Sequence, residues 1–189
     1  MNEKTRCPWA HSKPEYIEYH DSEWGRPVHD DRKLFEMLTL ESMQAGLSWI
    51  TILRKRDGFR EAFDGFDPKK VALYDDAKIR ELMANGKIVR NRLKIESAVN
   101  NAKRFLEVAE EHGSFSNMIW SYVDDKPIEG RWKKMEDIPI TTPLSDMISK
   151  DLKKMGFKFV GSTAVYSFMQ AIGMVNDHIA NCFVHEVDA

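Results

Sequence analysis

The two cysteines of the chain each lie close to a histidine in the sequence. Twelve residues separate Cys7 from His20, and three separate His178 from Cys182. If the second pair lies on a helix, its side chains are one turn apart and face the same way. Two thiolates and two imidazoles form a ligand set that tetrahedral zinc uses, and four protein ligands leave no position for a water. The pattern indicates a structural zinc site joining the ends of the chain, or else a coincidence of spacing.

Glu41 is a carboxylate on the apolar side of a predicted helix. Leu34, Leu38 and Glu41 follow the i, i+4, i+7 spacing of one helix face. A carboxylate buried there must be paired, be protonated or be kept for a ligand. The alternative is a glutamate at the rim of the helix that reaches solvent.

Large aromatic residues are concentrated near the start of the chain. They are Trp9, Tyr16, Tyr19, Trp24, Phe35 and Trp49. We expect Trp24 and Phe35 to belong to the core. The three that lie between Cys7 and His20 occupy a proline-containing segment, which a metal would hold rigidly. Exposed aromatic faces of this kind stack on nucleic-acid bases, each contact contributing about 1–3 kcal/mol.

Length and composition restrict the class of protein. The chain has 189 residues, 28 Lys and Arg against 30 Asp and Glu, and a formal net charge of −2. With 42% hydrophobic and 31% charged residues it has the composition of one folded domain rather than of a disordered chain. No run approaches the ~18 apolar residues of a membrane span. The first residues lack an apolar leader segment, so we expect a cytoplasmic protein.

Hydrophobic periodicity predicts an all-α protein with few or no strands. The predicted helices cover 30–45, 49 to about 56, a segment starting at Asp67-Pro68, another starting at Asp75 or Asp76, about 90–112, 114–123, 143–154 and 161–173. Gly46, Gly113 and Gly156 follow three of these helices as expected stops. Residues 124–142 are rich in turn formers and are predicted to form a surface loop.

Residues 77–112 are predicted to form a helix, a short turn and a second helix. A hairpin of this size can direct backbone N–H groups at one phosphate. Residues 87–104 hold six bases and one acid, whereas 105–137 hold eight acids and four bases. A weaker basic patch contains Lys150, Lys153, Lys154 and Lys158. Such charges either form a solvated face or bind phosphates in a sequence-independent, salt-sensitive way.

Several sequence blocks, in order along nearly the whole chain, resemble the 3-methyladenine DNA glycosylase I family. They are Cys7-x-Trp9, YxxYHDxEWG at 16–25, Leu40-Glu41, QAGLSW at 44–49, IVRxRxKI at 88–95, GFKFVG at 156–161 and NDH at 176–178. The resemblance implies an all-α helix-hairpin-helix DNA glycosylase fold with a zinc-bound lobe joining the N- and C-termini. It implies one glycosylase domain over 1–189, with a zinc-tied terminal lobe at 1–28 and 160–189 and a helical core at 30–155 containing the hairpin at 77–112.

The resemblance also implies roles for individual residues. One structural Zn²⁺ would be bound by Cys7, His20, His178 and Cys182. Glu41 would be the catalytic residue, and the substrate would be bound by Trp9, Tyr16, Tyr19 and Trp49. DNA would be bound by Gly86, Lys87, Arg90 and Arg92. The implied activity is extrusion and hydrolytic excision of 3-methyladenine from alkylated double-stranded DNA, leaving an abasic site, by a monomer without lyase activity or an obligate protein partner.

The missing groups agree with this reading. No Gly-Pro-Asp stretch follows the hairpin, and no isolated lysine in an apolar context suggests a Schiff base. An adenine methylated at N3 is already cationic, so little acid catalysis is needed to release it. Two other classes remain open at this stage, a non-enzymatic DNA-binding or damage-sensing hairpin module and a zinc hydrolase. Within the enzyme class, 3-methylguanine is an alternative substrate.

Overall fold

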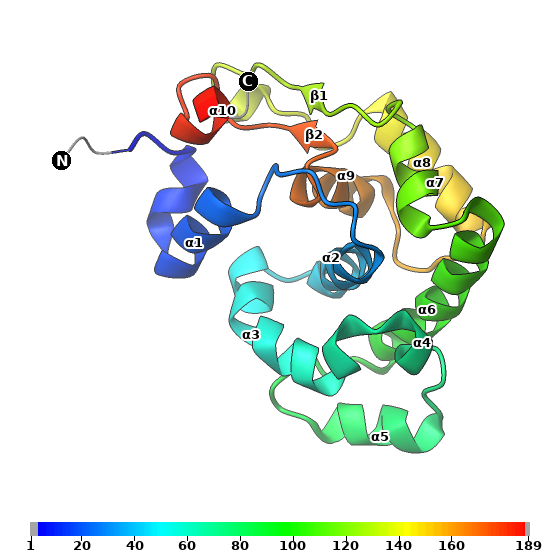
Figure 1. Cartoon of the computed structure of the whole chain (residues 1–189). Helices are drawn as coiled ribbons and strands as arrows, with labels where there is room; N and C mark the ends of the chain where they lie inside the picture. Colours follow the sequence, from blue (N-terminus) through cyan, green and yellow to red (C-terminus); the bar gives the residue numbers. More distant parts are fainter. Residues whose placement is uncertain (1–3, 188–189) are drawn as a thin grey trace.

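The computed structural model describes residues 4–187 as a helical protein (Figure 1). The elements are η1 (Pro8–Ser12), α1 (Pro14–Ser22), α2 (Asp31–Gln44), α3 (Trp49–Ala62), η2 (Asp64–Phe66), α4 (Pro68–Val71), α5 (Asp76–Ala84), α6 (Arg92–His112), α7 (Phe115–Ser121), β1 (Ile128–Glu129), η3 (Met135–Asp137), α8 (Pro143–Lys154), α9 (Ser162–Ala171), β2 (Val175–Asn176) and α10 (Phe183–Val187). The all-α class predicted from periodicity is confirmed. No described helix is long and apolar enough to cross a membrane.

Side-chain caps set several helix starts. The side chains of Asp30, Asp75 and Asn91 accept hydrogen bonds from backbone N–H groups in the first turns of α2, α5 and α6. Thr142 forms a reciprocal capping box at the start of α8. Gly113 ends α6 in the left-handed conformation, with φ of 81°, which an L side chain adopts only with strain. Local sequence therefore fixes most boundaries of the core helices.

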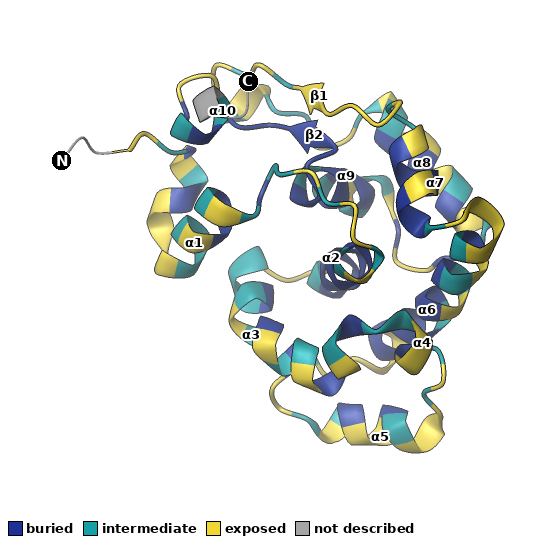
Figure 2. Cartoon of the chain, in the orientation of Figure 1, coloured by how far each residue is buried: buried dark blue, intermediate teal, exposed yellow. Residues whose placement is uncertain are grey.

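α2 is the central helix of the fold (Figures 1 and 2). Residues 34–43 are buried on every side of it, as expected for a helix enclosed by other elements. α3, α6 and α9 all pack against α2. Any functional group on α2 is therefore held on a rigid support.

The two ends of the chain meet beside α1. The N–H of Phe183, at the start of α10, donates to the carbonyl of Thr5 at 2.8 Å. Figure 1 shows α1 and α10 near one another, away from α5. Residues close to both termini are thereby brought to one side of the molecule.

The structure differs from the sequence prediction in several elements. Residues 14–22 form helix α1, and α3 continues to Ala62 rather than ending near Arg56. α6 begins at Arg92 because Asn91 caps it. The predicted loop 124–142 contains β1, which pairs in parallel with β2 through Ile128 and Val175. That ladder joins segments far apart in sequence, so no local pattern predicts it.

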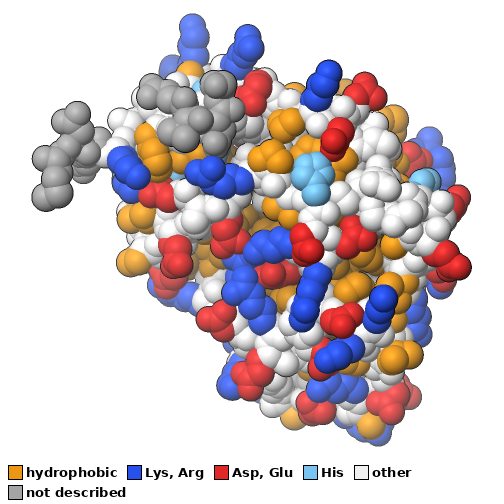
Figure 3. Space-filling view, viewed as in Figure 1, with side chains coloured by type: hydrophobic (Ala, Val, Ile, Leu, Met, Phe, Trp, Pro, Cys, Tyr) orange, Lys and Arg blue, Asp and Glu red, His pale blue; other side chains and the backbone are white. Residues whose placement is uncertain are grey.

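The expected core aromatics are buried. Trp24 is 8% exposed and Phe35 is fully buried. At the surface, acidic and basic side chains are interspersed over the face seen in Figure 3. This mixture agrees with the net charge of −2 and shows no single-sign field on that face.

Candidate functional site

An aromatic cavity of about 460 Å³ lies among α1, α2, α3 and α9. Its aromatic lining consists of Trp9, Tyr16, Tyr19, Trp24 and Trp49. The volume lies within the range of small-molecule sites. The four residues predicted to bind substrate are therefore brought together, with Trp24 as an additional lining residue.

Glu41 is the only carboxylate among the residues that line this cavity, and it lies on the predicted apolar face of α2. It is 5% exposed, and its Oε2 atom has no hydrogen-bond partner in the described part of the chain. Burial raises the pKa of Glu41 to about 8. In the free protein at neutral pH the side chain is therefore mostly protonated, and a cation in the cavity would favour its ionised form.

The aromatic rings pack against one another in edge-to-face and tilted contacts. Trp9 meets Tyr16 at a centroid distance of 5.5 Å and Trp24 at 5.1 Å. Tyr19 lies 5.5 Å from Trp49. Burial, and then the charge of the nearby carboxylate on α2, raise the pKa of Tyr19, so that its phenol stays protonated. Rings packed in this way give the cavity fixed walls.

The start of α3 is tied to the cavity by a backbone hydrogen bond. The N–H of Ile50 donates to Tyr16 Oη at 3.0 Å. The neighbouring Trp49 is partly exposed, but its Nε1 atom is buried and has no partner among the described residues. Two residues that line the cavity, one on α2 and one on α3, thus each have a buried polar atom without a partner among the described residues.

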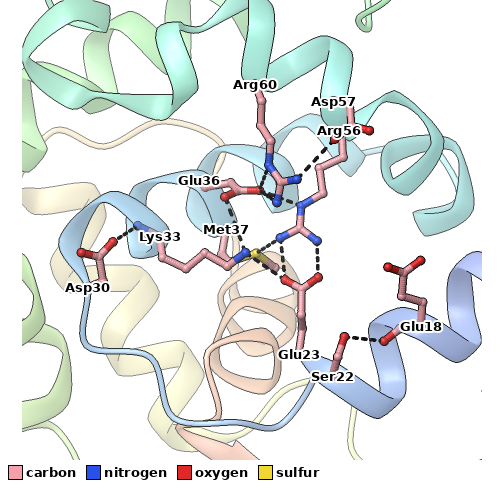
Figure 4. Close-up of polar contacts among 10 residues, drawn as sticks. All are labelled: Glu18, Ser22, Glu23, Asp30, Lys33, Glu36, Met37, Arg56, Asp57 and Arg60. Atoms are coloured by element: carbon pink, nitrogen blue, oxygen red, sulfur yellow. Dashed lines mark hydrogen bonds and ion pairs between the residues drawn. The ribbon is translucent and has the colours of Figure 1, made fainter.

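A partly buried ion-pair network connects α2, α3 and the end of α1 (Figure 4). Arg56 on α3 binds both oxygens of Glu23 at 2.8 Å and donates to Glu36 on α2 at 2.6 Å. Burial opposes ionisation of Glu23, but hydrogen bonds from Arg56 and Lys33 lower its pKa to about 2. The network fixes the end of α1, α2 and α3 relative to one another.

The four predicted metal ligands meet at one buried point. Their ligand atoms all lie within 4.8 Å of one another. Cys182 Sγ is 3.5 Å from His178 Nδ1 and 3.4 Å from His20 Nε2, and Cys7 Sγ is 3.6 Å from His178 Nδ1. The sequence pattern assumed that His178 and Cys182 lie on a helix, but the segment between them is not helical. A turn brings the two side chains together instead, with the N–H of Cys182 donating to the carbonyl of Ile179.

The second nitrogen of each histidine also has a partner. His20 Nδ1 lies 2.9 Å from Asp21 Oδ1, and His178 Nε2 lies 3.0 Å from the carbonyl of Trp24. A carbonyl and a carboxylate accept only, so these nitrogens carry the protons. In a neutral imidazole with this tautomer, the nitrogen that faces the cysteines has a free lone pair, as metal binding requires.

The four residues predicted to bind DNA lie at the turn between α5 and α6. Arg90 is exposed and forms no ion pair within the described residues. Lys87 pairs with Glu61 at 2.7 Å, and Arg92 pairs with Glu96 at 2.6 Å. A Cβ on Gly86 would meet no atom within 4 Å. The turn is therefore open to a partner, but two of its three cations are already partly neutralised.

Lys94 differs from its predicted place on the basic face of this hairpin. It is 6% exposed, and its Nζ donates to the carbonyls of Met43 and Ala45 at the end of α2. Its ammonium group binds free carbonyls at the C-terminal end of α2, where a positive charge is stabilising, instead of facing solvent. Charge counting could not detect this because those carbonyls are distant in sequence.

Sequence reasoning missed several residues that line the cavity. Besides Trp24, they are Ser12, Gln44, Met135, Ile138, Ser167 and Gln170. Gln44 belongs to the QAGLSW block, and the two residues of α9 are polar positions one turn apart in the mostly apolar stretch 164–171, so these three had a signal. Met135 and Ile138 reach the cavity from the segment 124–142 through long-range packing, for which the sequence has no local pattern.

The fold and cavity define a helical protein with a small-molecule-sized cavity bounded by aromatic rings and one buried carboxyl group. Comparison with known proteins gives the family. The family model described as methyladenine glycosylase matches residues 9–185. The chain therefore belongs to the methyladenine glycosylase family, as its sequence blocks indicated.

Individual relatives match over almost the whole chain. A DNA-3-methyladenine glycosylase of Haemophilus influenzae is 48% identical over 178 residues, which are 94% of this chain and 96% of the relative. A crystal structure of a 3-methyladenine DNA glycosylase I has a TM-score of 0.93 at 49% identity and covers 96% of this chain and 100% of that one. A tyrosine-to-phenylalanine variant of such an enzyme, in complex with 3-methyladenine, has a TM-score of 0.91 at 40% identity and covers 94% and 96%.

Proposed function

We propose that this chain is a DNA repair enzyme that extrudes a 3-methyladenine nucleotide from alkylated duplex DNA and hydrolyses its N-glycosidic bond. The observation that carries this proposal is the buried carboxyl of Glu41, with Oε2 unpartnered, in a cavity walled by aromatic rings. The names of the matched glycosylases, and the relative solved in complex with 3-methyladenine, support it. An extruded base in such a cavity is recognised by stacking and by its polar edge.

The chemistry asks little of the protein beyond binding. A purine methylated at N3 is cationic, and breaking the bond from its N9 to C1′ of the sugar returns the electron pair to the ring. The base leaves neutral, while water adds to C1′ and loses a proton. Aromatic faces attract the cationic ring by roughly 0.5–2 kcal/mol each. Glu41, ionised once the cation is bound, would stabilise it by charge, and the enclosing walls would keep bulk water away.

The proposed enzyme is a hydrolase without lyase activity. A lyase of this kind needs an amine that reaches C1′. The buried lysine of the chain, Lys94, does not line the cavity, and its Nζ is hydrogen-bonded to two backbone carbonyls. The aromatic cavity in turn distinguishes an excising enzyme from a DNA-binding hairpin module, which has no use for a base-sized site.

We also propose one structural zinc ion, bound by the two cysteines and two histidines. Tetrahedral bonds of the usual lengths to sulfur and nitrogen would separate neighbouring ligand atoms by about 3.6 Å, and the sulfur-to-nitrogen distances here are 3.4–3.6 Å. All four side chains are fully buried. A buried site with four protein ligands gives no access to water, which argues against the zinc-hydrolase alternative. The division into a zinc-tied lobe at 1–28 and 160–189 and a core at 30–155 remains part of this proposal.

Two surfaces are candidates for binding the DNA backbone. The hairpin at 77–112, with Gly86, Lys87, Arg90 and Arg92, remains our predicted contact. The second is the hairpin of α8 and α9, where Lys150 and Lys153 border a depression beside Ser162. α9 also lines the base cavity, which supports this second surface. Both hairpins fit a helix-hairpin-helix role, and neither excludes the other.

Base release from methylated DNA tests the activity. Duplex DNA treated with a methylating agent is incubated with the protein, and the freed bases are separated chromatographically. We expect release of 3-methyladenine, an equal number of abasic sites, and no strand breaks at neutral pH. Binding of methylated DNA without release would support the damage-sensing module instead. Strand breaks at the abasic sites would contradict the absence of lyase activity.

Charge-removing variants separate the two DNA surfaces. We compare Arg90→Ala with a double variant that carries Lys150→Ala and Lys153→Ala. The control is Lys126→Ala, an exposed change that belongs to neither surface. Loss of a phosphate contact raises the KM for DNA and weakens the dependence of that KM on salt concentration. If neither variant does so, both proposed surfaces are wrong.

A further inference from the structure

Gln170 is a polar residue that the function above does not use. It lies on α9 and lines the aromatic cavity together with Ser167, one helical turn earlier. α9 packs against α2, the helix that carries Glu41. The backbone at this position is also fixed, because the N–H of Gly25 donates to the carbonyl of Gln170 at 3.0 Å. Glu41 and Gln170 thus border one cavity from two packed helices.

The amide of Gln170 is held by a buried carboxylate. Gln170 Nε2 donates to Asp177 Oδ2 at 2.8 Å, and Tyr166 Oη donates to the same oxygen at 2.6 Å. Trp132 Nε1 donates to Oδ1 of Asp177 at 2.6 Å. Asp177 is fully buried and forms no ion pair within the described residues. Three neutral donors therefore surround this carboxylate.

The acceptor character of Asp177 decides which way the amide points. A carboxylate accepts hydrogen bonds and an amide oxygen cannot donate, so Nε2 must be the atom that faces Asp177. The amide oxygen, Oε1, is then the atom left for another partner. It accepts no hydrogen bond within the described part of the chain, although Gln170 borders the cavity. Nε2 uses one of its two N–H groups on Asp177, and Oε1 is the acceptor that Gln170 can offer to a ligand.

We propose that Gln170 determines specificity by accepting a hydrogen bond from the exocyclic amine of a 6-aminopurine through its Oε1 atom. This inference rests on the proposed glycosylase function and adds a second acceptor to the Glu41 carboxylate. Adenine carries a donor amine at its 6-position, whereas guanine carries an acceptor oxygen there. A 6-oxopurine would place its oxygen against Oε1, with no proton between them. Asp177 is the positioning residue that keeps the amide in this orientation.

The first test is Gln170→Leu, which keeps the approximate size of the side chain and removes the acceptor. Release of 3-methyladenine and of 3-methylguanine is measured from the same methylated DNA. Binding of each free base is measured by the change in tryptophan fluorescence. We expect the preference for 3-methyladenine to fall about tenfold, the usual size for one lost hydrogen bond. If Gln170 had only a structural role, release of both bases would fall equally and the ratio of 3-methyladenine to 3-methylguanine would not change.

The matched control is Gln44→Leu. It makes the same chemical change at another glutamine of the cavity, one that has no bond to Asp177. We expect this variant to release 3-methyladenine and 3-methylguanine in the wild-type ratio, even if the rate of release of each base changes.

The second test, Asp177→Asn, is designed to reverse the orientation of the Gln170 side-chain amide. Trp132 Nε1 can only donate, so the new amide must keep its oxygen toward Trp132 and turn its NH₂ group toward Tyr166 and Gln170. The Tyr166 hydroxyl can accept, and Gln170 would flip to accept as well. Its Nε2 would then face the cavity as a donor that fits a 6-oxygen. We expect the preference to shift toward 3-methylguanine, further than in Gln170→Leu.

The outcomes separate this inference from the proposed function. If a folded Gln170→Leu variant releases 3-methyladenine and 3-methylguanine in the same ratio as the wild-type protein, the role of Gln170 is overturned. The glycosylase function still stands in that case, provided that the wild-type protein releases 3-methyladenine. A wild-type protein that releases no methylated base refutes the function itself. If Asp177→Asn does not fold, Gln170→Leu and its control decide alone.

Discussion

Glu41 on α2 and Trp49 at the start of α3 border the same cavity, and each keeps one buried polar atom without a hydrogen-bond partner among the described residues. The two atoms differ in character, because Trp49 Nε1 can only donate and an ionised Glu41 can only accept. A ligand that satisfies both must offer an acceptor and a donor. An adenine ring carries both, in its ring nitrogens and its amine. A ligand that reached both atoms would remove the cost of leaving them unsatisfied.

Substitution of the carboxyl tests its role in excision. Glu41→Gln keeps the size of the side chain but cannot ionise, so the cationic base loses its counter-charge. We expect single-turnover excision of 3-methyladenine to fall by about 10- to 100-fold, given that hydrogen bonds to charged groups contribute about 1.5–3 kcal/mol. Glu18→Gln, an exposed change on α1, is the control and should leave the rate unchanged. Wild-type rates in a folded Glu41→Ala variant would refute the role.

The same carboxyl makes stability depend on pH. Its pKa rises from the ordinary 4.5 to about 8 in the folded protein, so the folded state holds the proton more tightly than the unfolded state does. The resulting stabilisation is fully present below about pH 4.5, falls between pH 4.5 and 8, and is absent above pH 8. Glu41→Gln lacks this dependence. We expect it to be more stable than the wild type at pH 8.5, and the difference to be smaller at pH 5.

Urea unfolding of both proteins at several pH values measures this difference. Acidic groups with lowered pKa, such as Glu23, contribute the opposite slope at lower pH in both proteins, so the comparison cancels them. A gap that does not change between pH 5 and pH 8.5 would show that Glu41 is not buried in the uncharged form.

Metal content tests the cysteine and histidine cluster. We expect one zinc ion per chain in protein purified without a tag, and a large loss of thermal stability when a strong chelator removes it. Cys182→Ser should lower zinc content and stability together, whereas His11→Ala, an exposed change in η1 near the cluster, should change neither. Elemental analysis measures the zinc content, and thermal unfolding measures the stability. Tag-free protein without zinc would contradict the proposal.

Local sequence patterns predicted the parts of the site that a single helix determines. The 3.6-residue period placed Glu41 on the inner face of α2, and its burial is confirmed. The spacing of His178 and Cys182 indicated the right pair, although a turn and not a helix brings them together. Contacts between distant segments were beyond such patterns. Gln170 and Ile138 reach the cavity only because α9 and the segment 124–142 pack beside α1 and α2.

Lys94 shows why charge patterns fail where side chains turn inward. Counted with its neighbours, it belongs to a basic face. In the structure its Nζ donates to the carbonyls of Met43 at 2.8 Å and Ala45 at 2.5 Å. These carbonyls close α2 just after Glu41 and begin the loop that leads to Trp49. A lysine placed there supports the connection between two cavity residues.

Lys94→Met therefore tests a role in support against a role in DNA contact. It keeps the length of the side chain but leaves two carbonyls without their charged donor, and we expect a loss of about 2–3 kcal/mol in the free energy of unfolding. The kcat for excision should also fall, because the loop between Glu41 and Trp49 loses its anchor. Lys103→Met removes the same charge from an exposed position on α6 and should change neither. If Lys94 instead contacts phosphates, its variant will keep wild-type stability and will mainly raise KM and weaken the salt dependence of DNA binding.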